Sequence, residues 1–128
     1  MIAPNSTTLL LIDDEPMMVS VIGSMLEFLN CHVLKTVDVD QALDIYEKHK
    51  NEIDLIFVDQ MMPKMTGIAL AKKLYDQDPS VKIVLMTGSS IEDFEARDDI
   101  EGVSAFLQKP FSFEDLERMV KNELNVHA

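Results

Sequence analysis

Residues 9–15 have the sequence LLLIDDE, in which four consecutive apolar residues are followed at once by three acids. Four further short runs rich in β-branched and large apolar residues occur at residues 32–35, 55–58, 83–86 and 105–107. Such runs, about four residues long and without clean polar–apolar alternation, are typical of strands covered on both faces. The sequence therefore predicts five buried strands.

Segments with helical spacing lie between these runs. Apolar residues recur at intervals of three or four within residues 18–29, 39–46, 68–74 and 113–124. Ile91 and Phe94 mark a shorter and weaker helix, and Ser112 with Asp115 has the spacing of a helix N-terminal cap. Five strand–helix units in succession predict an α/β fold with a doubly wound parallel sheet and helices on both faces.

The composition limits the class of protein. A chain of 128 residues predicts one domain over residues 1–128. Its net charge of −12 argues against direct binding to nucleic acid or to an anionic membrane. The apolar runs are far shorter than the ~20 residues of a membrane span, and the N-terminus lacks the basic stretch of a signal peptide. We expect a soluble, cytoplasmic protein.

Polar residues follow four of the predicted strands. Asp13 and Asp14 come after the first, Asp59 after the third, Thr87 after the fourth and Lys109 after the fifth. Each alone is most simply an ordinary turn residue. Ligands of doubly wound sheets, however, bind at the carboxyl ends of the strands, so we expect these groups to share one crevice.

The expected cluster suits a hard cation. Neighbouring carboxylates repel each other unless a cation intervenes, and Mg²⁺ prefers oxygen ligands. Neither His nor Cys follows these strands, which argues against zinc. Asp13 or Asp14 with Asp59 is therefore a candidate Mg²⁺ site.

The same residues suit phosphoryl transfer. A carboxylate can act as a nucleophile and become an aspartyl phosphate, while positive charge stabilises the phosphoryl oxygens. Lys109 can supply part of that charge, Thr87 a hydroxyl donor, and Gly88 a close approach of backbone N–H groups. Together these residues describe an acceptor for a phosphoryl group.

Four motifs carry a family resemblance: LLIDDEP at residues 10–16, FVDQMMPKMTG at 57–67, VLMTG at 84–88 and FLQKPF at 106–111. With them the sequence resembles the receiver domain of bacterial two-component response regulators, over roughly residues 9–124. The resemblance implies a flavodoxin-like (βα)5 fold, like that of the chemotaxis regulators, with strand order 2-1-3-4-5.

The resemblance also implies the roles of the acids. Asp59 would be the phosphoacceptor, taking its phosphoryl group from a phosphohistidine on a sensor histidine kinase or a histidine phosphotransfer protein. Asp14 and Asp59 would bind Mg²⁺ (or Mn²⁺) directly, with the backbone carbonyl of Met61 as a third ligand and Asp13 acting mainly through water.

The remaining motif residues would form the switch. Lys109 would pair with the phosphoryl oxygens, Thr87 would move to hydrogen-bond the phosphate, and Phe106 would turn inward into the space that Thr87 vacates. The signal would then appear on the surface of the fourth helix, fifth strand and fifth helix. The family also has a cis peptide bond before the proline that matches Pro110.

Some positions depart from the family pattern. Thr66 replaces the usual Asp or Asn, which should matter little because Thr can also cap a helix. Phe106 replaces the commoner tyrosine. Met61 and Ser89 occupy positions that tune loss of the phosphoryl group, and Met61 cannot orient water by a hydrogen bond, so we expect slow loss. Like the other methionines, Met61 is expected to fill a gap in the packing.

Several alternatives stay open. We expect a regulatory domain rather than an enzyme; a haloacid-dehalogenase-like phosphatase fits less well, because such enzymes carry Asp-x-Asp on the first strand. A receiver-shaped adaptor that is never phosphorylated is the other alternative. The output would be a downstream protein target or a C-terminal output domain absent from this chain. The acidic run at residues 92–101 is either a solvated face or a docking surface for a basic partner.

Overall fold

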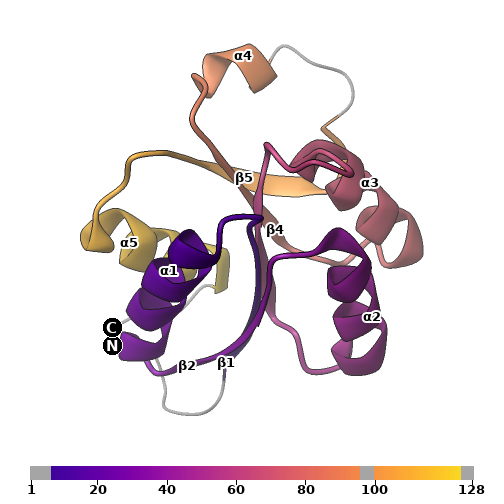
Figure 1. Cartoon of the computed structure of the whole chain (residues 1–128), viewed down its shortest axis with the longest axis horizontal. Coiled ribbons are helices and arrows are strands. Elements are labelled where there is room, and N and C mark those ends of the chain that lie inside the picture. The colour runs from indigo at the N-terminus through magenta and orange to yellow at the C-terminus, as the bar shows by residue number, and fades with distance from the viewer. Residues whose placement is uncertain (1–6, 96–99, 125–128) are drawn as a thin grey trace.

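The computed structural model describes residues 7–95 and 100–124. Strands and helices alternate along the chain (Figure 1). The strands are β1 (Thr7–Ile12), β2 (Cys31–Thr36), β3 (Leu55–Asp59), β4 (Ile83–Thr87) and β5 (Val103–Gln108). The helices are α1 (Pro16–Phe28), α2 (Val39–His49), α3 (Gly67–Gln77), α4 (Glu92–Glu95) and α5 (Phe113–Leu124).

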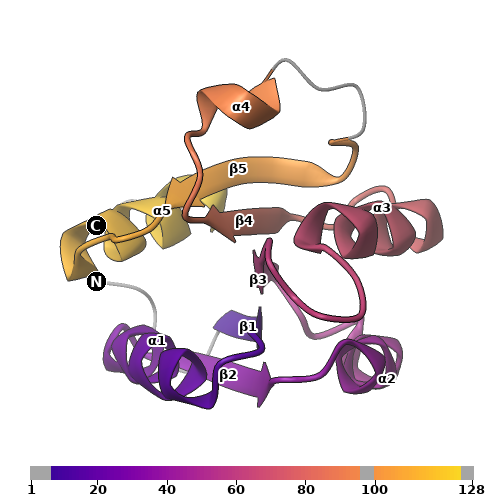
Figure 2. The same cartoon turned by 45° about the horizontal axis from the view of Figure 1, so that its top comes forward.

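The five strands form one parallel sheet in the order β2-β1-β3-β4-β5. Helices α1 and α5 cover one face and α2 and α3 cover the other, while the short α4 lies beyond β5 (Figure 2). This arrangement confirms the predicted doubly wound fold and its strand order. The carboxyl ends of β1, β3, β4 and β5 consequently meet along one edge of the sheet.

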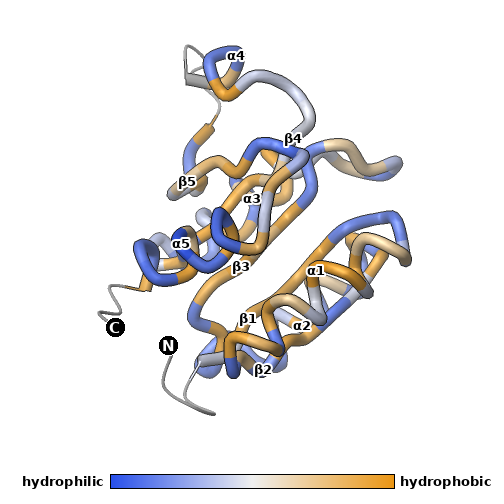
Figure 3. Tube along the Cα trace, turned by 90° about the vertical axis from the view of Figure 1, so that its left-hand side faces the viewer, coloured by the Kyte–Doolittle hydropathy of each residue, from blue (hydrophilic) through white to orange (hydrophobic). Residues whose placement is uncertain are grey.

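The core consists of two apolar layers, one on each face of the sheet. Successive side chains of a strand point to opposite faces. Leu9 and Leu11 therefore pack with α1 and α5, whereas Leu10 and Ile12 pack with α2 and α3. All four side chains are fully buried, and the central strands β1 and β3 are coloured as apolar over most of their length in Figure 3. These two layers fix the strand ends that carry the polar side chains.

Local signals set the helix starts. Asp38 accepts a hydrogen bond from the backbone N–H of Gln41 at 3.2 Å and caps α2. At α5, Ser112 and Asp115 each accept a hydrogen bond from the other's backbone N–H, which is the predicted capping pair. None of the helices in the described part of the chain has the length and apolar character needed to cross a membrane.

Candidate functional site

Three carboxylates meet at the carboxyl edge of the sheet. Asp13 and Asp14 directly follow β1 and Asp59 ends β3, and these two strands are paired neighbours. One carboxylate oxygen of each lies within 4.8 Å of the others. Asp13 and Asp59 are buried, whereas Asp14 is half-buried. Parallel pairing of β1 and β3 therefore produces the acidic cluster.

Lys109 enters this cluster from the end of β5. Its Nζ lies 3.0 Å from Asp59 Oδ1 and 3.2 Å from Asp13 Oδ2. Its backbone N–H donates a hydrogen bond of 2.7 Å to the carbonyl of Thr87, at the end of β4. The lysine is thus held at both its backbone and its ammonium group by residues at the ends of three other strands, β1, β3 and β4.

Burial and nearby charges shift the pKa values of Asp59 and Lys109. Burial is the main reason why the pKa of Asp59 is raised, and the nearby charges of Asp13 and Asp14 add to it, against the opposing effect of Lys109. Burial alone would lower the pKa of Lys109. The hydrogen bond to Asp59 and the charges of Asp13 and Asp59 outweigh it, so that pKa is raised. An ammonium group is therefore strongly held beside these acids.

The donor atoms of the cluster fit Mg²⁺. All three side chains offer oxygen, which hard cations prefer, and three carboxylates facing one ammonium leave negative charge that a divalent cation balances. Met61 lies two residues after Asp59, in the loop that borders the cluster. Its side chain is 73% exposed, so the expectation that Met61 fills a packing gap is wrong, although its neighbour Met62 is buried.

The two proposed switch residues lie on adjacent strands. Thr87, at the end of β4, is 1% exposed, and its Oγ1 accepts a hydrogen bond from the backbone N–H of Ser89 at 3.0 Å. Phe106, on β5, is half-buried, and its ring stacks on that of Phe94 with centroids 5.8 Å apart. Thr87 therefore lies at the acidic edge of the sheet, and Phe106 contacts Phe94 of α4.

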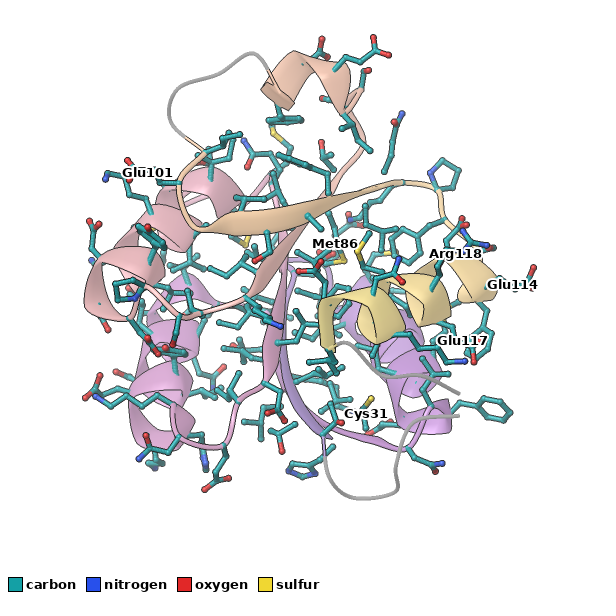
Figure 4. The ribbon with its side chains drawn as sticks, turned by 180° about the vertical axis from the view of Figure 1, so that it is seen from behind. Cys31, Met86, Glu101, Glu114, Glu117 and Arg118 are labelled. Carbon is teal, nitrogen blue, oxygen red and sulfur yellow. The ribbon has the colours of Figure 1, made fainter. Side chains whose placement is uncertain are left out.

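A groove of about 260 Å³ borders Phe106 on the surface formed by β5 and α5. Ile91, Arg118 and Met119 also line it. Arg118 appears in Figure 4 on α5, near Glu114 and Glu117. Residues 96–99 of the acidic run lie outside the described residues, so the two interpretations of that run stay open.

Sequence reasoning missed two residues that hold Asp59 in place. Gln60 is buried; its backbone N–H donates to the carbonyl of Met86, seen at the centre of Figure 4, and its Oε1 accepts from the backbone N–H of Ile68. Gly67 packs so closely that a Cβ there would lie 2.6 Å from the Asp59 carbonyl oxygen. A polar side chain directly after a buried strand was the available signal for Gln60.

Exposed apolar side chains border the site on α1. Met17 is 76% exposed and Val21 is 46% exposed. An apolar groove of about 310 Å³ runs from Val21 to Lys109 and Pro110, and it is also lined by Met18, Ile22, Met25 and Phe111. The groove thus shares one lining residue with the acidic cluster, Lys109, whose ammonium group contacts Asp59.

Comparisons with known proteins agree with this geometry. A receiver domain of a response regulator from Clostridium thermocellum superposes with a TM-score of 0.86 and 28% identity, covering 93% of this chain and 94% of that one. The regulatory protein PhoP of Bacillus subtilis is 32% identical over 88% of this chain and 46% of its own length. The sensor kinase CckA of Brucella abortus is 29% identical over 93% of this chain, which corresponds to 13% of that protein.

The family model of the response regulator receiver domain matches residues 9–121. The chain spans less than half of the length of PhoP and CckA, so only the shared domain is compared. In this domain the nucleophile candidate Asp59 ends β3, which does not favour a phosphatase with its nucleophile on the first strand. The chain therefore belongs to the response regulator receiver domain family and is a phosphorylation-activated switch of two-component signalling.

Proposed function

We propose that Asp59 accepts a phosphoryl group from a phosphohistidine on a sensor histidine kinase or a histidine phosphotransfer protein. The observation that carries this proposal is the contact of one ammonium, Lys109, with both Asp59 and Asp13 inside the acidic cluster. A buried carboxylate beside a fixed cation is suited to receive an anionic group.

In the proposed reaction a carboxylate oxygen of Asp59 attacks phosphorus while the phosphorus–nitrogen bond to histidine breaks. Asp13, Asp14, Asp59 and the Met61 carbonyl would hold Mg²⁺, or Mn²⁺ in its place, which when bound neutralises charge on the phosphoryl oxygens. Lys109 already lies 3.0 Å from Asp59 Oδ1 and so stands ready to contact one of these oxygens. Positioning and charge supply most of the catalysis of such transfers.

Phosphorylation would then act through Thr87 and Phe106. The Thr87 hydroxyl exchanges its hydrogen bond with Ser89 for one to the phosphoryl group, and Phe106 turns into the space released. Because Phe106 stacks on Phe94, this movement changes the surface of α4, β5 and α5. The receiver of this signal is a downstream protein or a C-terminal output domain, and nucleic acid and membranes are not direct partners.

The remaining proposals concern the chain as a whole. Residues 1–128 form one cytoplasmic receiver domain that assists its own phosphorylation and dephosphorylation but has no separate enzymatic substrate.

The exposed Met61 side chain lacks a group that orients water, which supports slow loss of the phosphoryl group. Rapid hydrolysis that slows when Met61 is replaced by Leu would contradict this.

The phosphohistidine donor is proposed to dock on α1. The groove between α1 and Pro110 is apolar and is lined by Lys109, whose ammonium group contacts Asp59. In the proposed complex a helix of the donor fills this groove and presents its histidine to Asp59. Exposed Met17 and Val21 extend this surface along α1. Apolar helix faces are bound by complementary helices in this way.

The test is incubation with acetyl phosphate and Mg²⁺, followed by intact-mass measurement. We expect a gain of one phosphoryl group, abolished by a chelator and by Asp59→Asn. Asp44→Asn, which removes an exposed carboxylate of α2, is the matched control and should be labelled normally. Absence of labelling from acetyl phosphate and from every phosphohistidine donor would favour the adaptor that is never phosphorylated.

The same measurement tests the docking surface when the donor is a protein. With a histidine kinase that phosphorylates the wild type, Val21→Asp should slow transfer at least tenfold because a charge would be buried in the apolar contact. Labelling of this variant by acetyl phosphate should stay unchanged. Ser24→Asp, at an exposed position of the same helix, is the control.

A further inference from the structure

Lys64 connects two loops that border the acidic cluster. It lies in the segment between β3 and α3, and its Nζ lies 3.1 Å from Asp38 Oδ1 and 3.0 Å from Asp40 Oδ2. Asp38 is the N-cap residue of α2, and Asp40 lies in the first turn of that helix. One ammonium therefore joins the loop after β3 to the start of α2.

The loop between β3 and α3 is otherwise fixed near its two ends. At its start, the backbone N–H of Gln60 donates to the Met86 carbonyl. At its end, Thr66 Oγ1 accepts from the backbone N–H of Ala69 and caps α3. Between these points Met62 is buried, and Lys64 makes the ion pairs that reach α2.

This link lies next to the candidate metal ligands. A hollow of about 200 Å³ is lined by Asp14 together with Asp38, Met62 and Lys64. The Met61 carbonyl belongs to the same loop, three residues before Lys64. Asp38 is itself oriented, because its other oxygen, Oδ2, accepts the Gln41 backbone N–H while Oδ1 accepts Lys64.

We propose that Lys64 is a positioning residue for metal binding: its ion pairs with Asp38 and Asp40 hold the loop that carries the Met61 carbonyl beside Asp14 and Asp59. This inference rests on the proposed function, in which that carbonyl is a Mg²⁺ ligand. Removing Lys64 should weaken Mg²⁺ binding by about threefold to tenfold, the size expected from two exposed ion pairs of ordinary strength.

Whether Mg²⁺ affinity falls or rises when Lys64 is replaced separates the positioning role from a purely electrostatic one. Loss of a lysine near an anionic site makes the local potential more negative, which by itself would strengthen binding of a cation. A loop that loses its anchor would instead bind the cation more weakly. The two explanations therefore predict opposite signs for the same substitution.

The experiment is a calorimetric titration of the whole protein with MgCl₂. Lys64→Met should bind Mg²⁺ threefold to tenfold more weakly than wild type, and Lys64→Arg should restore most of the affinity. Lys72→Met is the matched control: it makes the same charge change on α3, where Lys72 pairs with Asp76 and Glu101. Equal or tighter binding by Lys64→Met would overturn the proposal.

Two further measurements keep the outcome specific. Asp40→Asn should weaken Mg²⁺ binding, yet should have little additional effect in the Lys64→Met background; additive effects would contradict the link. In metal-free protein, hydrogen exchange at the backbone amides of residues 61, 62, 64 and 65 should be faster in Lys64→Met than in wild type. If the wild type itself binds no Mg²⁺, the proposed function fails with this inference, whereas normal wild-type binding and an unaffected variant overturn the inference alone.

Discussion

At the acidic edge, Asp59 is a buried carboxylate, and keeping it ionised there lowers the stability of the folded protein. Asp59 is 6% exposed and shares its surroundings with two further carboxylates, which is why its pKa is raised. The folded protein therefore holds a proton on Asp59 more tightly than the unfolded chain does. The resulting stability is present at low pH and is lost as the pH rises through the raised pKa.

Asp59→Asn should consequently stabilise the metal-free protein at neutral pH. We expect a gain of about 1 kcal/mol, or roughly 4 °C in the unfolding midpoint. The gain should shrink as the pH falls below the ordinary range of an aspartate, where the wild-type carboxyl is protonated in both states. Thermal unfolding in the presence of a chelator, from pH 3 to 8, measures this; a variant less stable than wild type at pH 7 would contradict it.

The second residue is Gly67, which packs too closely against the site to carry a side chain. A Cβ on Gly67 would meet both the Asp59 carbonyl oxygen and Leu85 Cδ1 at 2.6 Å, so Gly67→Ala must push α3 away from β3. We expect a loss of about 1–3 kcal/mol in the free energy of unfolding, as for other overpacked sites. Urea denaturation measures it. Gly88→Ala is the control, since a Cβ at Gly88 would meet nothing within 4 Å.

Among the elements, all five strands could be located from the sequence because buried parallel strands are short continuous apolar runs. Their exact limits could not. Thr7 and Thr8 belong to β1 because they pair with Cys31 and His32 of β2, and this pairing has no apolar signal. The fourth helix likewise begins one residue later than its apolar spacing indicates, at Glu92, so Ile91 lies before it.

The site was predictable to the extent that it depends on strand ends. The fold class and the places of Asp13, Asp59 and Lys109 at strand ends were enough to predict that these residues meet, because parallel strands end at one edge of the sheet. The Lys64 link was not predictable: its partners lie 24 and 26 positions earlier in the chain, and a single exposed lysine has no periodicity that would connect it to α2.

For the whole molecule, the excess of acids makes a divalent cation a stabilising ligand. The net charge is −12, and the three clustered carboxylates repel one another when no cation is bound. A ligand that binds only the folded state adds stability by mass action, about 2.7 kcal/mol at 100 times its dissociation constant.

We therefore expect Mg²⁺ to raise the unfolding midpoint of the wild-type protein in a concentration-dependent way. NaCl at matched ionic strength is the control, because it screens the overall charge without filling the site. The difference between the two salts should be much smaller for Asp14→Asn. Equal effects of MgCl₂ and NaCl on the wild type would argue against a specific site.

The position of Lys109 after β5 also means that the site is completed late during biosynthesis. As the ribosome extends the chain, the acids that follow β1 and β3 emerge long before the ammonium group that contacts them. A nascent chain that has folded only its first four strands has a cluster of acids without its lysine. In the proposed mechanism, which uses Lys109, the chain therefore becomes able to accept a phosphoryl group only after β5 has been synthesised.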